Sequence, residues 1–358
     1  MNKNTYVVIM AGGVGTRFWP YSRAYKPKQF LDILGCGKTL LQLTFERFAT
    51  NVPVENIYIV SNARYKDLIN EQLPLILDDQ ILLEPFQRNT APCVAYASYK
   101  IAQNNSEANI IVTPSDHAIF NDTGFIKTIN LALEVSQSGD KLVTIGIKPH
   151  KPETGYGYIQ YLEEGVSSAK KVKTFTEKPE LELAEKFIES GDFVWNAGLF
   201  VWSAYTILNA FEKHTPDIAS LFKDIEHDYY TSNENEKVNE AYAQCKNISI
   251  DYAILEKADN VWVVLGDFGW SDLGAWDSLY ELREKEENKN VLEGNITTYD
   301  VNNCIISSSS DKLIVVEGLE DYLVADNDNA LLICKRGNSD MMRTIVKDVK
   351  LNKGEKFL

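Results

Sequence analysis

Residues 6–17 read YVVIMAGGVGTR, and this stretch decides the fold. Its first five residues form a short, β-branched apolar run, which is typical of a strand buried on both faces. Glycines at positions 12, 13 and 15 follow at once, and they let backbone N–H groups turn toward an anion because no Cβ intervenes. Arg17 can add a forked guanidinium for phosphate oxygens. The stretch therefore predicts a buried strand that leads into a phosphate-binding loop.

Two other glycine motifs fit this loop poorly. A dinucleotide-binding fingerprint needs Gly or Ala three residues after Gly15, where Phe18 stands. Residues 37–39, GKT, imitate the end of a P-loop, but its first glycine would fall on Asp32. A glycine turn without a ligand is the remaining alternative. It is disfavoured by three further cations close by, namely Arg23, Lys26 and Lys28.

The distribution of charge supports an anionic ligand near the amino end. The chain carries 36 Lys and Arg against 51 Asp and Glu, a net charge of −15, which disfavours nucleic acid and anionic lipid as partners. Residues 1–31 nevertheless contain five basic residues and no acidic one. We find no apolar run long enough for a membrane helix and no hydrophobic leader, and the five cysteines are scattered. We therefore expect a cytoplasmic protein without a disulfide framework or a zinc site.

The first 150 residues alternate between strand and helix patterns. Apolar runs predict strands at residues 6–10, 56–60, 81–83, 109–112 and 142–145, and amphipathic segments predict helices at 40–48, 66–73, 91–101 and 125–135. Such a series favours an α/β, Rossmann-like domain with a mostly parallel mixed sheet and helices on both faces. Ligands of these sheets bind at the carboxyl ends of the strands.

The pattern loosens after residue 150 and changes again after 285. Strands at 156–161, 172–175 and 261–265 and helices at 179–190 and 276–285 extend the first domain with a sugar-sized pocket. From residue 286 short β segments and turns predict a small C-terminal β-rich domain, compatible with a few coils of a β-helix. We expect a catalytic domain at 1–285, in halves 1–150 and 151–285, and a β domain at 286–358. The Asp326 run resembles a calcium loop only superficially, because the glycine of such a loop is missing.

Seven motifs carry a resemblance to a known family. Residues 11–30, AGGVGTRFWPYSRAYKPKQF, resemble the signature of the sugar nucleotidyltransferases. The others are similar to the mannose-1-phosphate guanylyltransferase branch and follow in order: EPFQRNTAP at 84–92, VTPSDH at 112–117, GIKPHKPETGYGYI at 146–159, FTEKP at 175–179, FVWNAGLFVW at 193–202 and GWSDLGAW at 269–276. The resemblance implies nucleotidyl transfer from GTP to α-D-mannose 1-phosphate, with GDP-mannose and pyrophosphate as products and Mg²⁺ as cofactor.

This chemistry needs cations rather than a general base. A phosphate monoester is already an anion near neutral pH, because its second pKa is about 6. The resemblance assigns Arg17 to the leaving pyrophosphate and Lys28 to the α-phosphate, and it gives Mg²⁺ to the carboxylates of Asp116 and Asp272. The alternative for each aspartate is a residue that stabilises a turn or caps a helix.

The remaining candidate residues form two binding sets and an aromatic group. The nucleotide set implied by the resemblance is Ala11, Gly12, Gly13, Gly15, Thr16, Arg17, Gln87, Arg88, Asn89 and Ser115. Asn89 has the alternative of capping the helix that begins near residue 91. The sugar-phosphate set is Gly157, Glu177, Lys178 and Asn196. We expect the aromatic group to be core and pocket wall rather than a stacking platform; it consists of Trp195, Phe200, Trp202, Trp270 and Trp276.

Two other functions stay open at this point. One keeps the reaction but uses another hexose 1-phosphate or another base. The other is a catalytically silent sensor of nucleotide sugars, which the pair of aspartates and the basic loop disfavour. We expect the apolar β segments of the tail to pack against the main domain or a second copy of the chain, which predicts a homodimer.

Overall fold

The run at residues 6–10 is strand β1 (Thr5–Met10), and it lies in the parallel part of a large sheet. In the computed structural model, which describes residues 3–163 and 169–358, β1 pairs in parallel with β2 (Ile57–Asn62) and β4 (Asn109–Pro114). Val8 belongs to a core cluster with residues of the following helices, and its neighbours Val7 and Ile9 are fully buried as well. Since successive side chains of a strand point to opposite faces, both faces of β1 are covered.

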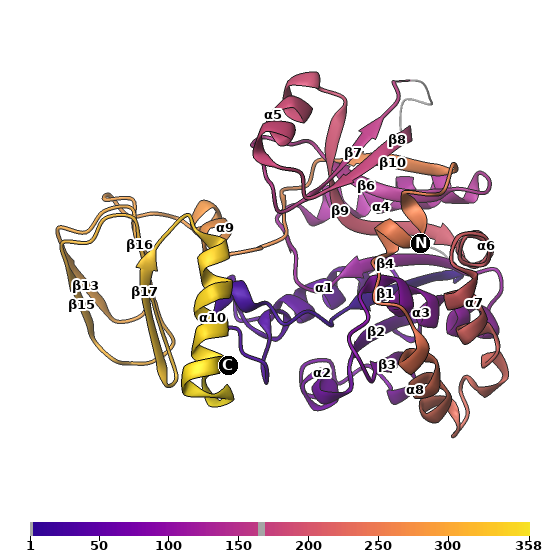
Figure 1. Cartoon of the computed structure of the whole chain (residues 1–358), viewed down its shortest axis with the longest axis horizontal. Coiled ribbons are helices and arrows are strands. Elements are labelled where there is room, and N and C mark those ends of the chain that lie inside the picture. The colour runs from indigo at the N-terminus through magenta and orange to yellow at the C-terminus, as the bar shows by residue number, and fades with distance from the viewer. Residues whose placement is uncertain (1–2, 164–168) are drawn as a thin grey trace. The chain divides into compact units, whose positions relative to one another are not determined.

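The sheet is mixed, as predicted, and has the strand order β3-β2-β1-β4-β9-β6-β10-β8-β7 (Figure 1). Strands β8 and β9 run against the others, because each pairs antiparallel with its neighbours, whereas β3, β2, β1 and β4 are parallel and β6 is parallel to β10. The remaining strands are β3 (Ile81–Glu84), β6 (Leu142–Ile147), β7 (Gly157–Tyr161), β8 (Lys170–Glu177), β9 (Phe193–Ser203) and β10 (Val261–Gly266).

Helices cover this sheet where the sequence periodicity predicts them. Helix α3 contacts β1 and β2, and α4 contacts β6, β9 and β10. A second layer of helices packs on α3 through α6 and α7. The helices of this part are α1 (Leu40–Ala49), α2 (Lys66–Gln72), α3 (Thr90–Asn104), α4 (Asp122–Gln137), α5 (Leu181–Ser190), α6 (Ala204–His214), α7 (Pro216–Lys223) and α8 (Glu234–Gln244).

Contacts group the chain into two units, and each unit is built from two separate segments. The first unit comprises Met1–Gly12 and Leu41–Trp270, and the second comprises Gly13–Leu40 and Ser271–Leu358. The boundary expected at residue 285 falls inside the second unit. The glycine loop thus belongs by its contacts to the same unit as the C-terminal residues.

The C-terminal part of the second unit contains stacked β coils. Strands β12 (Val291–Glu293), β14 (Ile305–Ser308) and β16 (Tyr322–Asn327) pair in parallel, and so do β13 (Ile296–Tyr299) and β15 (Ile314–Glu317), which is the arrangement of a short β-helix. Strand β17 (Ala330–Lys335) is antiparallel to β16 (Figure 1). Val301, Ile306 and Val324 form the buried interior of these coils.

The expectation of a β-rich tail misses one helix of this unit. Helix α9 (Trp276–Leu282) confirms the prediction of a helix at 276–285, but α10 (Ser339–Lys353) was not predicted. The side chain of Asn338 accepts a hydrogen bond from the backbone N–H of Met341 and so caps α10. Met342 is buried on the inner side of α10 while its neighbour Met341 is exposed. Amphipathic helices with many charges give a weak sequence signal, because only a narrow stripe is apolar.

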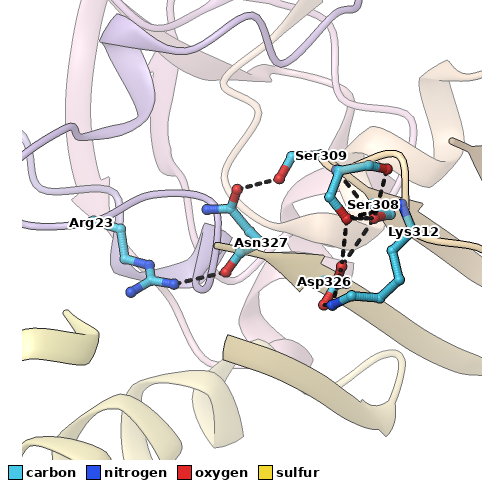
Figure 2. Close-up of polar contacts among 7 residues, drawn as sticks. Arg23, Ser308, Ser309, Lys312, Asp326 and Asn327 are labelled. Carbon is cyan, nitrogen blue, oxygen red and sulfur yellow. Dashed lines mark hydrogen bonds and ion pairs between the residues drawn. The ribbon is translucent and has the colours of Figure 1, made fainter. Parts of the chain in front are cut away.

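Within the second unit the glycine-loop segment is tied to the C-terminal coils by Arg23 (Figure 2). Its side chain is only 2% exposed. Its guanidinium donates to the carbonyl oxygens of Pro20 (2.6 Å) and Asn327 (3.0 Å) and to Oδ1 of Asn329 (3.1 Å). These acceptors replace water around a buried cation. Arg23, which the sequence analysis counted among the cations near the ligand, is thus a structural anchor.

The acidic run at residues 326–329 also serves the packing of this unit. The Asp326 carboxylate pairs with the Lys312 ammonium (3.0 Å) and accepts from the hydroxyls of Ser308 and Ser310 (Figure 2). In the described ranges no group of three or more His, Cys, Asp or Glu side chains is placed to hold a metal ion.

Among the described residues no helix has both the length and the apolar character needed to cross a membrane. The structure contains a single copy of the chain, and the expected homodimer stays a prediction.

Candidate active site

In the first unit, hydrogen bonds hold the backbone just beyond β1 in place. The N–H of Ala11 donates to the carbonyl of Val60 (2.7 Å), and the carbonyl of Ala11 accepts from the Ser61 hydroxyl (2.7 Å). The N–H of Ser115 donates to the carbonyl of Met10 (3.0 Å). The carboxyl ends of β1, β2 and β4 are therefore tied together, and Ala11 and Ser115 of the predicted nucleotide set lie at this edge.

The loop between β3 and α3 reaches the same edge. The Gln87 amide donates to the carbonyl of Gly12 (2.8 Å), which brings two predicted nucleotide residues together. Arg88 donates from Nε to the carbonyl of Tyr242 (3.4 Å). The Asn89 side-chain oxygen accepts from the N–H of Thr90, so Asn89 caps α3 as its alternative assignment predicted.

Sequence reasoning missed Glu84, which ends β3 beside this loop. Its side chain is 5% exposed, and its Oε1 accepts from the Tyr242 hydroxyl (3.1 Å). A Cβ at Gly12 would lie 3.3 Å from Oε2 of Glu84, so this oxygen faces the glycine. Burial raises the pKa of Glu84 to about 7, and the hydrogen bond from Tyr242 lowers it in part. Glu84 is the first residue of EPFQRNTAP, and its position at the end of an apolar strand was the available signal.

Three predicted sugar-phosphate residues meet in the first unit. Gly157 on β7 pairs with Glu177 on β8, and a Cβ at Gly157 would come within 2.5 Å of Oε2 of Glu177. The same Cβ would lie 3.5 Å from Cβ of Asn196 on β9. A side chain at position 157 would push the Glu177 carboxylate out of its present place. The Glu177 carboxylate pairs with the ammonium of Lys178. The backbone φ of Lys178 is 49°, which is strained for a residue other than glycine. Such strain is common at functional sites.

Asp251 is a second residue that the sequence analysis missed. Asn196 donates from Nδ2 to Oδ1 of Asp251 (2.8 Å), and its own Oδ1 accepts from the N–H of Gly198 (3.1 Å) and the Thr144 hydroxyl (3.2 Å). Asp251 begins a π-helical turn, Asp251–Leu255, a rare element that often marks functional sites. Burial and then the charge of Glu177 raise the pKa of Asp251 to about 6. The two carboxyl groups, of Asp251 and Glu177, and the Asn196 amide thus form a polar cluster suited to a ligand rich in hydroxyls.

The raised pKa of Asp251 predicts a pH-dependent effect on stability. Its folded pKa of about 6 lies above the ordinary 3.8, so the carboxylate disfavours folding progressively as pH rises from about 4 to 6. Replacing Asp251 by asparagine, which keeps the acceptor for Asn196, should raise the free energy of unfolding by roughly 2 kcal/mol at pH 7.5. Urea unfolding at pH 7.5 and pH 4.5 measures the difference. An equal effect at the two pH values would contradict the assignment.

In the second unit, Gly15 makes a tight turn against Lys28. Its φ is 55°, and a Cβ there would lie 2.7 Å from Cβ of Lys28 and 2.8 Å from Oγ of Ser22. The Ser22 hydroxyl donates to the carbonyl of Val14 (3.0 Å), and the Gln29 amide donates to that of Gly13 (2.9 Å). The loop is therefore held in one shape, with Thr16 beginning a 3₁₀ turn, Thr16–Phe18.

Two predicted catalytic residues come together in this unit. The ammonium of Lys28, whose side chain is buried, donates to the carbonyls of Asp272 (2.8 Å) and Leu273 (3.0 Å). The Asp272 carboxylate accepts from the N–H of Gly274 (2.8 Å). These contacts join residues 244 positions apart in the sequence. A cation and an acidic turn thus lie side by side under the glycine loop.

Arg17 lies among residues of the C-terminal segment. It lines a small pocket together with Trp276, Arg336 and Met342. Its Nε is buried and has no hydrogen-bond partner in the described structure. A buried guanidinium nitrogen without a partner is rare in proteins and fits a group that binds an anionic ligand.

A Gly15→Ala substitution should disrupt the loop. An alanine at this positive φ has a strained backbone, and its methyl group would overlap Cβ of Lys28. We therefore expect kcat/KM to fall at least about 10-fold. The matched control is Gly37→Ala, because φ at Gly37 is 82° but nothing lies within 4 Å of the added atom. Steady-state kinetics of both variants measure the effect. Equal losses in the two would show that backbone strain alone, rather than the contact with Lys28, matters.

The two predicted metal ligands belong to different units. Asp116 follows Ser115 in the first unit, and Asp272 belongs to the second. His117, which follows Asp116, accepts at Nδ1 from the Trp270 indole (3.1 Å) and is thus a hydrogen-bonded histidine. Two carboxylates fit Mg²⁺, since this ion takes few protein ligands and completes its shell with water and phosphate oxygens. Their joint coordination of one ion stays a prediction.

The aromatic group confirms its predicted structural role. Trp195, Phe200, Trp202 and Trp276 are at most 4% exposed. In the first unit, Trp270 and Tyr156 pack against Trp195 with ring centroids 5.1–6.4 Å apart. These rings form an aromatic cluster next to Asn196, since Trp195 is its neighbour in β9.

Comparison with known proteins identifies the class to which this fold and site belong. The nucleotidyl transferase family matches residues 6–289. The chain therefore belongs to this family.

Individual relatives extend the similarity over nearly the whole chain. The mannose-1-phosphate guanylyltransferase of Escherichia coli is 35% identical over 96% of this chain and 75% of its own length, and that of Salmonella montevideo is 36% identical over 96% and 74%. The crystal structure of mannose-1-phosphate geranyltransferase from Thermus thermophilus superposes with a TM-score of 0.87 at 32% identity, covering 97% of this chain and 99% of that protein. The similarity therefore includes the C-terminal coils.

Proposed function

We propose that the chain is a mannose-1-phosphate guanylyltransferase, which transfers the guanylyl group of GTP to mannose 1-phosphate and yields GDP-mannose and pyrophosphate. The observation that carries the proposal is the near-complete coverage of this chain by relatives that bear this name. It is supported by a glycine loop that turns tightly against Lys28 and by the cluster of polar side chains around Asn196.

The reaction is a direct exchange at one phosphorus atom. An oxygen of the sugar phosphate forms a bond to the α-phosphorus of GTP, and the bond from that phosphorus to the bridging oxygen of pyrophosphate breaks. The nucleophile needs no base, since its second pKa is about 6. Catalysis must come from positioning and from neutralising the charge of two polyanions.

The side chains of each unit have separate tasks in this proposal. Backbone N–H groups of Gly12, Gly13 and Gly15 bind phosphate oxygens, Lys28 neutralises the α-phosphate, and Arg17 binds the leaving pyrophosphate. Glu177 and Asn196 hold sugar hydroxyls and Lys178 holds the sugar phosphate. Mg²⁺ on Asp116 and Asp272 would supply positive charge between the two anions when bound.

Release of pyrophosphate tests the proposal. Purified protein is mixed with GTP, mannose 1-phosphate and MgCl₂, and both pyrophosphate and GDP-mannose are quantified. The two products should form in equal amounts. Parallel reactions replace mannose 1-phosphate by glucose 1-phosphate, and GTP by UTP or ATP, and kcat/KM values are compared.

Each result decides between the functions considered. Highest kcat/KM with GTP and mannose 1-phosphate supports the proposal. A higher value with another hexose 1-phosphate or base identifies a different nucleotidyltransferase. Binding of GDP-mannose without any release of pyrophosphate would identify a sensor and refute the enzyme.

A further inference from the structure

A cavity in the first unit lies between α3 and the second layer of helices. Its volume is about 300 Å³, at the lower end of the range of pockets that hold small organic molecules. Each helix contributes one stripe of side chains, because residues three, four and seven positions apart lie on the same helix face. The lining residues are Tyr99, Ala102, Gln103 and Ser106 from α3 and the turn after it, Ala204, Tyr205, Leu208, Asn209 and Glu212 from α6, and Lys223 and Glu226.

This cavity is remote from the proposed active site. Asn89 caps α3 beside the nucleotide residues, and Tyr99 lies ten residues further on, about 15 Å along the helix. Ser203, directly before α6, pairs with Asn109, the first residue of β4, whereas Ser115 follows the last residue of β4. The cavity therefore lies toward the amino end of β4, and the nucleotide residues lie at its carboxyl end.

Tyr99 carries a buried hydroxyl group that the fold does not use. The residue is 5% exposed, and its hydroxyl has no hydrogen-bond partner among the described residues. Tyr229, a buried tyrosine of the same unit, instead donates its hydroxyl to the carbonyl of Phe222 (2.9 Å). Burial, and then the charges of Glu212 and Glu226, raise the pKa of Tyr99 well above its ordinary value. Both carboxylates line the cavity, which indicates that the Tyr99 hydroxyl faces it. Buried polar groups are nearly always paired, so a ligand can supply the missing hydrogen bond.

The two carboxylates of the cavity differ in how the fold neutralises them. Glu212 pairs with the ammonium of Lys223 (2.6 Å). Glu226 lies 3.6 Å from Nε2 of its neighbour His227, and in the part of the chain that the structure describes no lysine or arginine forms an ion pair with it. Two glutamates and one lysine give the lining a net negative charge. This charge disfavours phosphates, and therefore the substrates and products of the proposed reaction.

We propose that the cavity binds a small organic ammonium compound with an apolar body. The ammonium group donates to the Glu226 carboxylate and to the unpaired hydroxyl oxygen of Tyr99, and such charge-assisted hydrogen bonds are the strong ones. The apolar body packs on the aliphatic and aromatic part of the lining, which consists of Ala102, Ala204, Leu208 and Tyr205. The inference goes beyond the proposed function, because it uses no residue of the proposed active site.

The experiment uses three probes of similar size that differ in charge, namely 2-phenylethylamine, 2-phenylethanol and 3-phenylpropanoate. Their affinities for the full chain are measured by ligand-observed NMR titration at neutral pH, where the amine is protonated. The amine should bind at least about 10-fold more tightly than the alcohol, the usual worth of a hydrogen bond to a charged group. The carboxylate should bind most weakly, because it meets the charge of Glu226.

Two conservative variants and one control locate the binding. Tyr99→Phe removes only the hydroxyl and Glu226→Gln removes only the charge, and each should weaken binding of the amine about 10-fold. Tyr99→Phe breaks no hydrogen bond of the fold, so its midpoint of urea unfolding should not fall. Asp224→Asn is the matched control, because this exposed carboxylate lies two residues before Glu226 and does not line the cavity. Its affinity for the amine should equal that of the wild type.

The outcomes are decisive in both directions. Binding that prefers the amine, and that both cavity variants weaken and Asp224→Asn does not, supports the inference. Absence of amine binding at millimolar concentration overturns it, and so does equal binding of the alcohol or a wild-type affinity in either cavity variant. GTP with Mg²⁺ is finally added to the bound amine. Displacement of the amine by GTP would place it in the nucleotide site and would also overturn the inference.

Discussion

The Asp272→Asn variant should lose at least about 100-fold in kcat, the usual effect of removing one group that stabilises charge in a transition state. Asparagine keeps the side-chain oxygen that accepts from the N–H of Gly274, so the turn that holds Lys28 should remain. It removes the negative charge that the proposed Mg²⁺ needs. Turnover as a function of MgCl₂ concentration, with thermal unfolding to confirm the fold, measures the effect.

The Asp116→Asn variant should lose a similar factor, since both carboxylates are assigned to one ion. The double variant should then lose little more than either single one, because groups that act together are not additive. Asp267→Asn, an exposed carboxylate on the loop after β10, is the control and should retain normal turnover. Near-normal rates in either Asp116→Asn or Asp272→Asn would refute the metal assignment.

The second large effect is expected for Arg23→Met. This substitution leaves the carbonyls of Pro20 and Asn327 and the side chain of Asn329 without their donor, and we expect about 3 kcal/mol of lost stability. Turnover should fall at least about 10-fold as well, because Gly15 and Lys28 lie on the segment that Arg23 anchors in the second unit. Urea unfolding and steady-state kinetics on the same preparations measure both losses.

Lys26→Met removes the same charge three residues away, from an exposed side chain. Its stability should stay within about 0.5 kcal/mol of the wild type. If Arg23→Met and Lys26→Met lost activity equally, general positive charge near the loop would be important, and anchoring of the loop would not.

The local pattern of the sequence was sufficient for most of the first unit. The apolar runs that became β1, β2, β3, β4 and β6 are nearly continuous, and a strand buried on both faces requires such a run. Gly157 and Glu177, which pair in the structure, could also be assigned to one binding set beforehand, because both lie in motifs that carry the family resemblance. Helix α10 was missed, since its many charges hide a narrow apolar stripe.

Glu84 and Asp251 show where sequence reasoning about the site ended. Each stands at the edge of a recognisable segment, but its significance comes from burial beside another group, Tyr242 for Glu84 and Asn196 for Asp251. Separations of 158 and 55 residues hide these contacts from any local pattern. Asn89 illustrates the converse, since capping involves the next residue and could be foreseen as an alternative.

The order of strands and helices, the family and the glycine loop follow from the sequence itself, because hydrophobic periodicity and glycine chemistry act over a few neighbouring residues. The tertiary structure alone decided that residues 13–40 pack with the C-terminal segment, that Arg23 is an anchor, and that Lys28 meets the carbonyl of Asp272. A buried cation takes whichever acceptors the folded chain brings within about 3 Å of it. Distance along the sequence does not enter that choice.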